Sequence, residues 1–254
     1  MFLFDLTTTA INNYIDSKND LQALQYKRKT ALIIIYVLFL LSAAFGLYLA
    51  YLTDIIILLV GGICFLCGVF YTYGPVPISR QPLGEFLSGL FYGLLIPFII
   101  LYINMPRGTF LSLNFNFEII SLELKIVPMI SLLLFSIIPF CTTANIMLAN
   151  NICDLEKDIA VKRHTLPYYI GDRALYLFAG LYYLPYLALI IMVAFKILSP
   201  ICLLSLITII IVQKNISAFF KKQDKATTFV LAIKNYMIIM GSNTLMIFIS
   251  ALIA

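Results

Sequence analysis

The chain alternates between long apolar stretches and short polar segments, and this alternation predicts its architecture. Most of the apolar stretches have about the 20 residues that a helix needs to cross a bilayer. We expect helices at 2–20, 30–52, 55–73, 86–103, 126–151, 174–195, 201–212 and 227–254. The first is short and has a threonine-rich middle, so we expect that part to face the interior of a bundle. Residues 105–125 are predicted to form a polar loop.

The composition supports a membrane protein. The chain is 62% hydrophobic and 11% charged, whereas globular proteins are about 25% charged. We therefore predict an all-α, polytopic membrane helical bundle of about eight transmembrane helices, with residues 1–254 forming a single domain. The net charge of +5 is explained by lysines and arginines in the loops between helices, and it does not suggest nucleic acid as a partner.

Lysine and arginine are distributed unevenly between the two sets of loops. The connectors after the first, third, fifth and seventh helices hold thirteen, whereas the alternate connectors hold Arg107, Lys125 and Lys196 only. Cytoplasmic loops are the ones enriched in these residues. We therefore expect a multi-pass protein of the cell membrane in which the Pro-rich connector at 74–85 and residues 149–170 lie on the cytoplasmic side.

The most polar run of the chain lies at 149–170 and contains two carboxylates four residues apart, Asp154 and Asp158, preceded by Asn150. Residues at this spacing share one face of a helix. The same spacing occurs near the start of the chain, where Asn12, Asp16 and Asp20 cover roughly 12 Å of a helix face. Either motif alone fits a solvated acidic cluster equally well. Two such motifs on the same side of the membrane favour a cation site.

The chemistry of these oxygen ligands suits Mg²⁺, which typically takes one or two carboxylates and fills its remaining positions with waters and substrate phosphates. Cations that follow the second motif, Lys162 and Arg163, could neutralise phosphate oxygens. A diphosphate site at the edge of an apolar bundle predicts a substrate with a long apolar tail. We therefore expect a polyprenyl diphosphate, from which a metal-assisted departure of diphosphate would leave an allylic cation.

Two sequences, NNYIDSKND at 12–20 and NNICDLEKD at 150–158, resemble the two aspartate-rich motifs of the UbiA-type intramembrane prenyltransferases. The segments YTYGPVPISRQPLGEFLSGLFYG (71–93) and DIAVKRHTLPYYIGDRAL (158–175) resemble the branch of that family that prenylates 1,4-dihydroxy-2-naphthoate in menaquinone or demethylmenaquinone biosynthesis. This resemblance implies a Mg²⁺-dependent enzyme that transfers a polyprenyl group to an aromatic acceptor.

The resemblance also implies roles for individual residues. One group would hold Mg²⁺ and diphosphate: Asn12, Asp16, Asp20, Asp154 and Asp158. A second group would bind the substrates: Asn150 beside the metal ligands, Lys162 and Arg163 on the phosphates, Arg80 and Tyr73 as a cap, and Glu85 near the acceptor. Arg80 could equally be an anchor at the membrane surface. Glu85 could equally be an acidic partner of a helix N-terminus.

The chain also departs from the family pattern. The family has Asp after the first Asn, where this chain has Asn13. The first motif of the family lies on the second helix, whereas here it begins at residue 12, so we expect the first helix to be missing. A misassigned start, a shortened paralogue and a second subunit that supplies the helix are the three explanations. The alternatives are a different acceptor, of the 4-hydroxybenzoate or haem type, and a truncated non-catalytic paralogue that binds isoprenoid diphosphate. A transporter would need polar groups at mid-span, whereas these lie at the helix ends.

Overall fold

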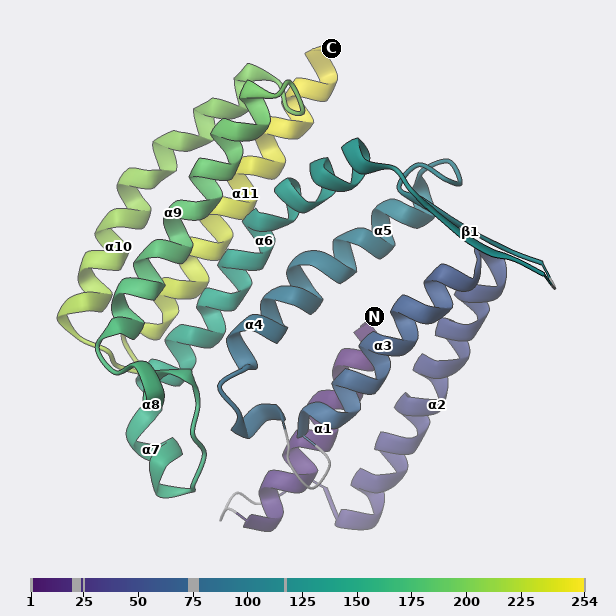
Figure 1. Cartoon of the computed structure of the whole chain (residues 1–254). Coiled ribbons are helices and arrows are strands. Elements are labelled where there is room, and N and C mark those ends of the chain that lie inside the picture. The colour runs from purple at the N-terminus through teal and green to yellow at the C-terminus, as the bar shows by residue number, and fades with distance from the viewer. Residues whose placement is uncertain (1, 20–23, 25, 73–77, 117, 254) are drawn as a thin grey trace. The chain divides into compact units, whose positions relative to one another are not determined.

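The computed structural model describes residues 2–19, 24, 26–72, 78–116 and 118–253, which are mostly helical (Figure 1). The chain divides into two compact units. The N-terminal unit comprises Met1–Ser79 and Leu113–Ser121, and the C-terminal unit comprises Arg80–Ser112 and Leu122–Ala254. The expectation of a single domain stays a prediction.

The N-terminal unit consists of three helices that pack on one another: α1 (Phe2–Asn19), α2 (Arg28–Leu52) and α3 (Ile55–Thr72). Phe4 of α1 stacks on Phe65 of α3 with 4.4 Å between the ring centroids. Thr7 is fully buried, and its hydroxyl donates to the Leu3 carbonyl oxygen at 2.7 Å. This bond satisfies the hydroxyl inside the helix, so the threonine faces the packed side of α1 without an unpaired polar group.

The C-terminal unit begins with α4 (Gly84–Ser88), a π-helical segment (Gly89–Leu95) and α5 (Ile96–Asn104), which run on as one 21-residue stretch. Then come α6 (Ile126–Cys153), α7 (Leu155–Ala160), α8 (Leu166–Ile170) and α9 (Arg173–Ala194). A 3₁₀ segment (Pro200–Thr208) leads into α10 (Ile209–Lys221), and α11 (Phe229–Ile253) ends the described chain. Between α5 and α6 lies a hairpin of β1 (Leu111–Phe115) and β2 (Ile120–Leu124).

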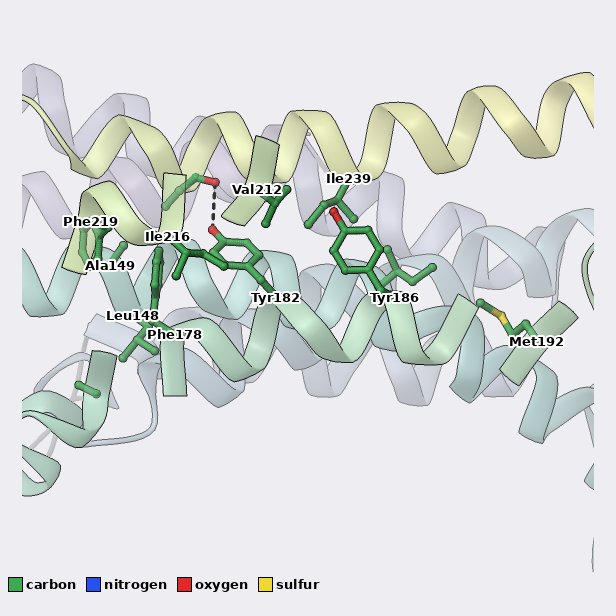
Figure 2. Packing of buried hydrophobic residues seen from close by; sticks show 13 residues of the cluster. Leu148, Ala149, Phe178, Tyr182, Tyr186, Met192, Val212, Ile216, Phe219 and Ile239 are labelled. Carbon is green, nitrogen blue, oxygen red and sulfur yellow. Dashed lines mark hydrogen bonds between the residues drawn. The ribbon is translucent and has the colours of Figure 1, made fainter. Parts of the chain in front are cut away.

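The core of the C-terminal unit lies where α6 packs against α9 and α11. Figure 2 shows Phe178 and Tyr182 of α9 projecting into this core together with Val212 and Ile216 of α10. The Tyr182 hydroxyl donates to the backbone carbonyl oxygen of Ala232 at 3.3 Å, the dashed line in Figure 2. A buried tyrosine usually finds such a partner, and here the bond joins α9 to α11.

The helices confirm the predicted class of a polytopic membrane helical protein. Within the described residues, six helices are long and apolar enough to cross a membrane, and Ile55–Tyr71 is a shorter apolar helix. The chain is therefore a multi-pass membrane protein. Each of the eight predicted helices has a counterpart among the described residues, with α1 as the short first one, and the prediction that about eight of them cross the membrane stays a prediction.

Two predicted boundaries were wrong. The penultimate helix, expected at 201–212, continues to Lys221. Its buried residues Val212, Ile216 and Phe219 recur at helical spacing beyond the apolar run, and the prediction had followed the apolar run alone. The polar loop expected at 105–125 contains the hairpin, because residues 111–124 alternate apolar and polar side chains and turn at Asn116, whose side-chain oxygen accepts the Ile119 N–H at 2.6 Å.

Candidate active site

The first acidic motif lies on α1 in the N-terminal unit. Asn12 and Asp16 are both within this helix, four residues apart, which places them on one face. The Asn12 side-chain oxygen is buried and has no hydrogen-bond partner, so it is available to a ligand. The side chain of Asp16, and the whole of Asp20, lie outside the described residues. Beside the motif, the Arg28 guanidinium lies 4.6 Å from the centre of the Tyr14 ring.

The second acidic motif lies at the junction of α6 and α7 in the C-terminal unit. Asp154 lies between α6, which ends at Cys153, and α7, which begins at Leu155. The helical hydrogen bonds continue through this junction: Asp154 N–H donates to the Asn150 oxygen at 3.0 Å and Asp158 N–H to the Asp154 oxygen at 2.9 Å. The backbone therefore keeps Asn150, Asp154 and Asp158 at successive helical turns although the helix is formally broken.

A lysine from a distant part of the chain contacts this motif. The Lys225 ammonium donates to the Asp154 carboxylate at 2.5 Å and to the side-chain oxygen of Asn150. Lys225 lies in the connector between α10 and α11, 71 residues from Asp154. Lys225 was not predicted as a site residue, because in the sequence it resembles the other lysines and arginines of the same set of loops.

The next carboxylate, Asp158, is paired with an arginine. Asp158 is 7% exposed, and the Arg163 Nε lies 3.9 Å from its Oδ1. Burial raises the pKa of the Asp158 carboxyl above its ordinary value, while the positive charge of Arg163 acts in the opposite direction. The second oxygen, Oδ2, is buried without a hydrogen bond. Asp158 thus has one oxygen that faces an arginine and one oxygen that is available to a cation or another ligand.

Glu85 is the third carboxylate of this region and comes from the first turn of α4. It is 4% exposed, and its Oε1 accepts a hydrogen bond from the Asn151 amide at 2.8 Å. Its Oε2 is buried without a partner. Asn151 was not predicted as a site residue, although it stands next to Asn150 in the motif.

The remaining predicted residues lie as follows. Arg80 is exposed at the end of a short 3₁₀ turn (Ile78–Arg80). Lys162 is exposed at a positive φ of 57° in the turn after α7, where it precedes Arg163. Tyr73 lies outside the described residues. The structure therefore brings Glu85, Asn150, Asp154, Asp158 and Arg163 into one unit and adds Asn151 and Lys225.

The donor set fits a hard divalent cation. Within the described part of the chain, no group of three His, Cys, Asp or Glu side chains is close enough to form a metal site. Mg²⁺, however, typically needs only one or two carboxylates from the protein. Asp154 and Asn150 already turn their oxygens to a positive charge, and Asp158 has a buried oxygen without a partner.

Comparison with known proteins identifies the family. The profile of the UbiA prenyltransferase family matches residues 1–239. The chain belongs to the UbiA prenyltransferase family. The resemblance predicted from the two motifs is therefore confirmed.

Individual relatives agree with this assignment. The chain is 25% identical over 180 residues to a 1,4-dihydroxy-2-naphthoate octaprenyltransferase of Bacillus subtilis (strain 168), which covers 66% of this chain and 51% of that protein. The chain thus spans about half the length of this curated relative. A solved structure of a digeranylgeranylglyceryl phosphate synthase has the same fold, with a TM-score of 0.61 and 17% identity over 99% of this chain and 81% of that one. The second subunit has no support in these comparisons and stays a prediction.

Proposed function

We propose that this chain is a membrane prenyltransferase that moves a polyprenyl group from polyprenyl diphosphate to an aromatic acceptor. The preferred acceptor in this proposal is 1,4-dihydroxy-2-naphthoate, as for the relative from Bacillus subtilis, in menaquinone or demethylmenaquinone biosynthesis. The observation that carries the proposal is the row of Asn150, Asp154 and Asp158 at the polar end of α6, facing the cations Lys225 and Arg163. Such a row suits a cation-bound diphosphate whose tail lies among apolar helices.

In this proposal the two acidic motifs hold Mg²⁺ together: Asn12, Asp16 and Asp20 from the first, with Asn150, Asp154 and Asp158 from the second. Mg²⁺ bound there would neutralise the diphosphate and make it a better leaving group. Carboxylate and amide oxygens are the ligands that this ion prefers.

The other residues act on the substrates directly. Arg163 and Lys162 donate to phosphate oxygens, a role that suits charge-assisted hydrogen bonds. Cleavage of the bond between the prenyl carbon and the diphosphate oxygen leaves an allylic cation, which aromatic faces stabilise. An electron-rich ring carbon of the acceptor then attacks that cation and forms the new C–C bond, and the ring regains its aromaticity when that carbon loses the proton, or the carboxylate as CO₂, that it carried. Glu85 offers its unpaired Oε2 to a hydroxyl of the acceptor, and Arg80 and Tyr73 cap the site.

The proposed location of the site is the cytoplasmic face of the cell membrane. Thirteen of the lysines and arginines lie in the same set of loops as both acidic motifs, and such loops are typically cytoplasmic.

The proposal is tested with membranes that contain the chain, a radiolabelled polyprenyl diphosphate and 1,4-dihydroxy-2-naphthoate. We expect labelled product with Mg²⁺ and loss of product when the divalent cations are chelated. Asp16→Ala and Asp154→Ala should each reduce the rate at least about a hundredfold, because each removes a charged ligand of the Mg²⁺ that would stabilise the leaving diphosphate. Glu156→Ala, an exposed acidic residue of α7, is the matched control and should retain activity.

Transfer that survives both aspartate substitutions would show that the motifs do not hold the diphosphate. Transfer to 4-hydroxybenzoate but not to the naphthoate would change the acceptor and leave the reaction class intact. A chain that binds the diphosphate and transfers nothing would be a non-catalytic paralogue.

A further inference from the structure

Lys225 is a cation of this region that the family resemblance did not predict. Its ammonium contacts two of the oxygens that the second motif offers to a cation, those of Asn150 and Asp154. The contact joins the connector after α10 to the end of α6, so it is a product of the tertiary fold. A positive charge already occupies the position where the motif should bind one.

The connector is built to present Lys225. The Asp224 carboxylate oxygen Oδ1 accepts hydrogen bonds from Ala226 N–H at 3.1 Å, Thr227 N–H at 2.8 Å and the Thr227 hydroxyl at 2.7 Å. The bonds from Thr227 lower the pKa of Asp224 below its ordinary value. In return, Asp224 N–H donates to the Thr228 hydroxyl at 2.8 Å. This reciprocal arrangement fixes the turn before α11.

The side chain of Lys225 is also directed by its own neighbours. The ammonium lies 4.7 Å from the centre of the Phe229 ring, one helical turn further along the chain. The nearby Lys222 pairs instead with Asp224, at 3.7 Å, and Arg163 pairs with Asp158. Each of these cations therefore has its own acidic partner, and Lys225 is the one directed to Asp154.

We propose that Lys225 is a tethered competitor for the divalent cation of the second motif, and that it moves to the diphosphate when substrate binds. This inference rests on the proposed function. With no diphosphate bound, the ammonium neutralises Asp154 and weakens the binding of any free cation. A diphosphate carries charged oxygens that can accept from the same ammonium. Once Lys225 turns to them, Asp154 and Asn150 are released, so cation and diphosphate favour each other's binding.

The test measures cation binding without catalysis. The full chain is purified in detergent, and free Mn²⁺ is followed by its electron paramagnetic resonance signal, with and without inorganic pyrophosphate. The Mn²⁺ that pyrophosphate binds by itself is measured in a titration without protein and subtracted. For the unsubstituted protein we expect weak Mn²⁺ binding that pyrophosphate strengthens. Lys225→Met should bind Mn²⁺ alone about tenfold more tightly, a change of about 1.4 kcal/mol. Pyrophosphate should strengthen Mn²⁺ binding less in this variant than in the unsubstituted protein. Lys225→Arg keeps the charge and should bind Mn²⁺ weakly.

The matched control is Lys221→Met, which removes an exposed lysine from the last turn of α10 and should leave Mn²⁺ binding unchanged. Circular dichroism and the melting temperature confirm that each variant folds. If Lys225→Met binds Mn²⁺ no more tightly than the unsubstituted protein, or if Lys221→Met gains as much, the competition does not exist. A lower melting temperature without any change in Mn²⁺ binding would make Lys225 a structural link and would also overturn the inference.

The inference and the proposed function can fail separately. Tighter Mn²⁺ binding by Lys225→Met in a chain that transfers no prenyl group would support the competition and overturn the proposed activity. Normal transfer by the unsubstituted protein, with Mn²⁺ binding that does not depend on residue 225, would support the proposed activity and overturn the competition.

Discussion

At the scale of single residues, the C-terminal unit holds buried polar groups that are only half satisfied. Glu85 and Asp158 each have one carboxylate oxygen in contact with a neighbour and one without a hydrogen bond. An unpaired buried acceptor costs about 1–3 kcal/mol, so such atoms are usually paired with protein, ordered water or a bound ion, and these two are free to accept from a substrate. Both residues were predicted from the sequence as site residues.

The role of Glu85 leads to a kinetic prediction. Glu85→Gln keeps an oxygen that can accept from Asn151, but it removes the charge that would hold an acceptor hydroxyl. We expect the KM for the aromatic acceptor to rise about tenfold or more, since hydrogen bonds to charged groups contribute about 1.5–3 kcal/mol, while the KM for polyprenyl diphosphate stays the same. Steady-state assays with each substrate varied in turn measure both.

Ser88→Ala is the control for Glu85, because the Ser88 hydroxyl donates only to the backbone oxygen of Glu85, at 3.0 Å, and its loss leaves the carboxylate in place. Both KM values should be unchanged in that variant. A Glu85→Gln protein whose KM values are normal and whose melting temperature alone is lower would give Glu85 a structural role.

At the scale of elements, α6 carries the second motif, so the packing of α6 sets its position. The π-helical segment crosses α6 at very short range: a Cβ on Gly93 would lie 2.2 Å from the Phe140 Cα and 2.3 Å from its backbone nitrogen. Small residues allow this kind of backbone approach between membrane helices. The same segment follows directly on α4, which carries Glu85, so the approach fixes Glu85 relative to the motif.

We therefore expect Gly93→Ala to destabilise the protein, because the new methyl group meets backbone atoms that cannot move aside. Overpacking of this kind typically costs about 1–3 kcal/mol, and it should lower the melting temperature in detergent. The control is Gly180→Ala on α9, where an added Cβ has no neighbour within 4 Å. That variant should be neutral or slightly more stable, since alanine favours helices by about 1 kcal/mol over glycine. Equal melting temperatures for the two variants would contradict the close approach.

At the scale of the whole molecule, the proposed reaction requires the acidic motifs of the two units to serve one diphosphate. A carboxylate oxygen lies about 2 Å from a bound Mg²⁺, and paired metals lie about 4 Å apart, so the oxygens of Asp16 and Asp154 should come within about 8 Å of each other. This requirement follows from the chemistry of the proposed site and from the positive-inside count, which predicts that both motifs lie on one side of the membrane.

Cross-linking measures this distance. The five native cysteines are replaced, and Asp16→Cys is combined with Asp154→Cys. A thiol reagent that spans about 8 Å, two metal–ligand distances plus the separation of paired metals, should join the two new cysteines. A protease site is inserted in the turn between β1 and β2. After cleavage, a gel shows whether the two halves of the chain are still joined by the cross-link. The control pair places the second cysteine at Ile126, at the other end of α6, and should not be joined. Cleaved halves that separate for both pairs would rule out a shared diphosphate site.

The sequence by itself determined the class of fold, the positions of the helices and the two acidic motifs. These features are local: an apolar run of sufficient length must leave water, and residues four apart on a helix share a face wherever that helix lies. The ends of the helices were predicted less well, as α10 shows. A helix continues for as long as one of its faces remains buried, and that burial depends on tertiary contacts.

Only the tertiary structure decided which partners the motif residues have. Lys225 is 71 residues from Asp154 and Glu85 is 66 residues from Asn151, and no pattern in the sequence relates either pair. Their contacts depend on how α4, α6 and the connector before α11 pack. Hydrophobic periodicity specifies which face of a helix is buried, but the packing of helix against helix decides which polar side chain meets which.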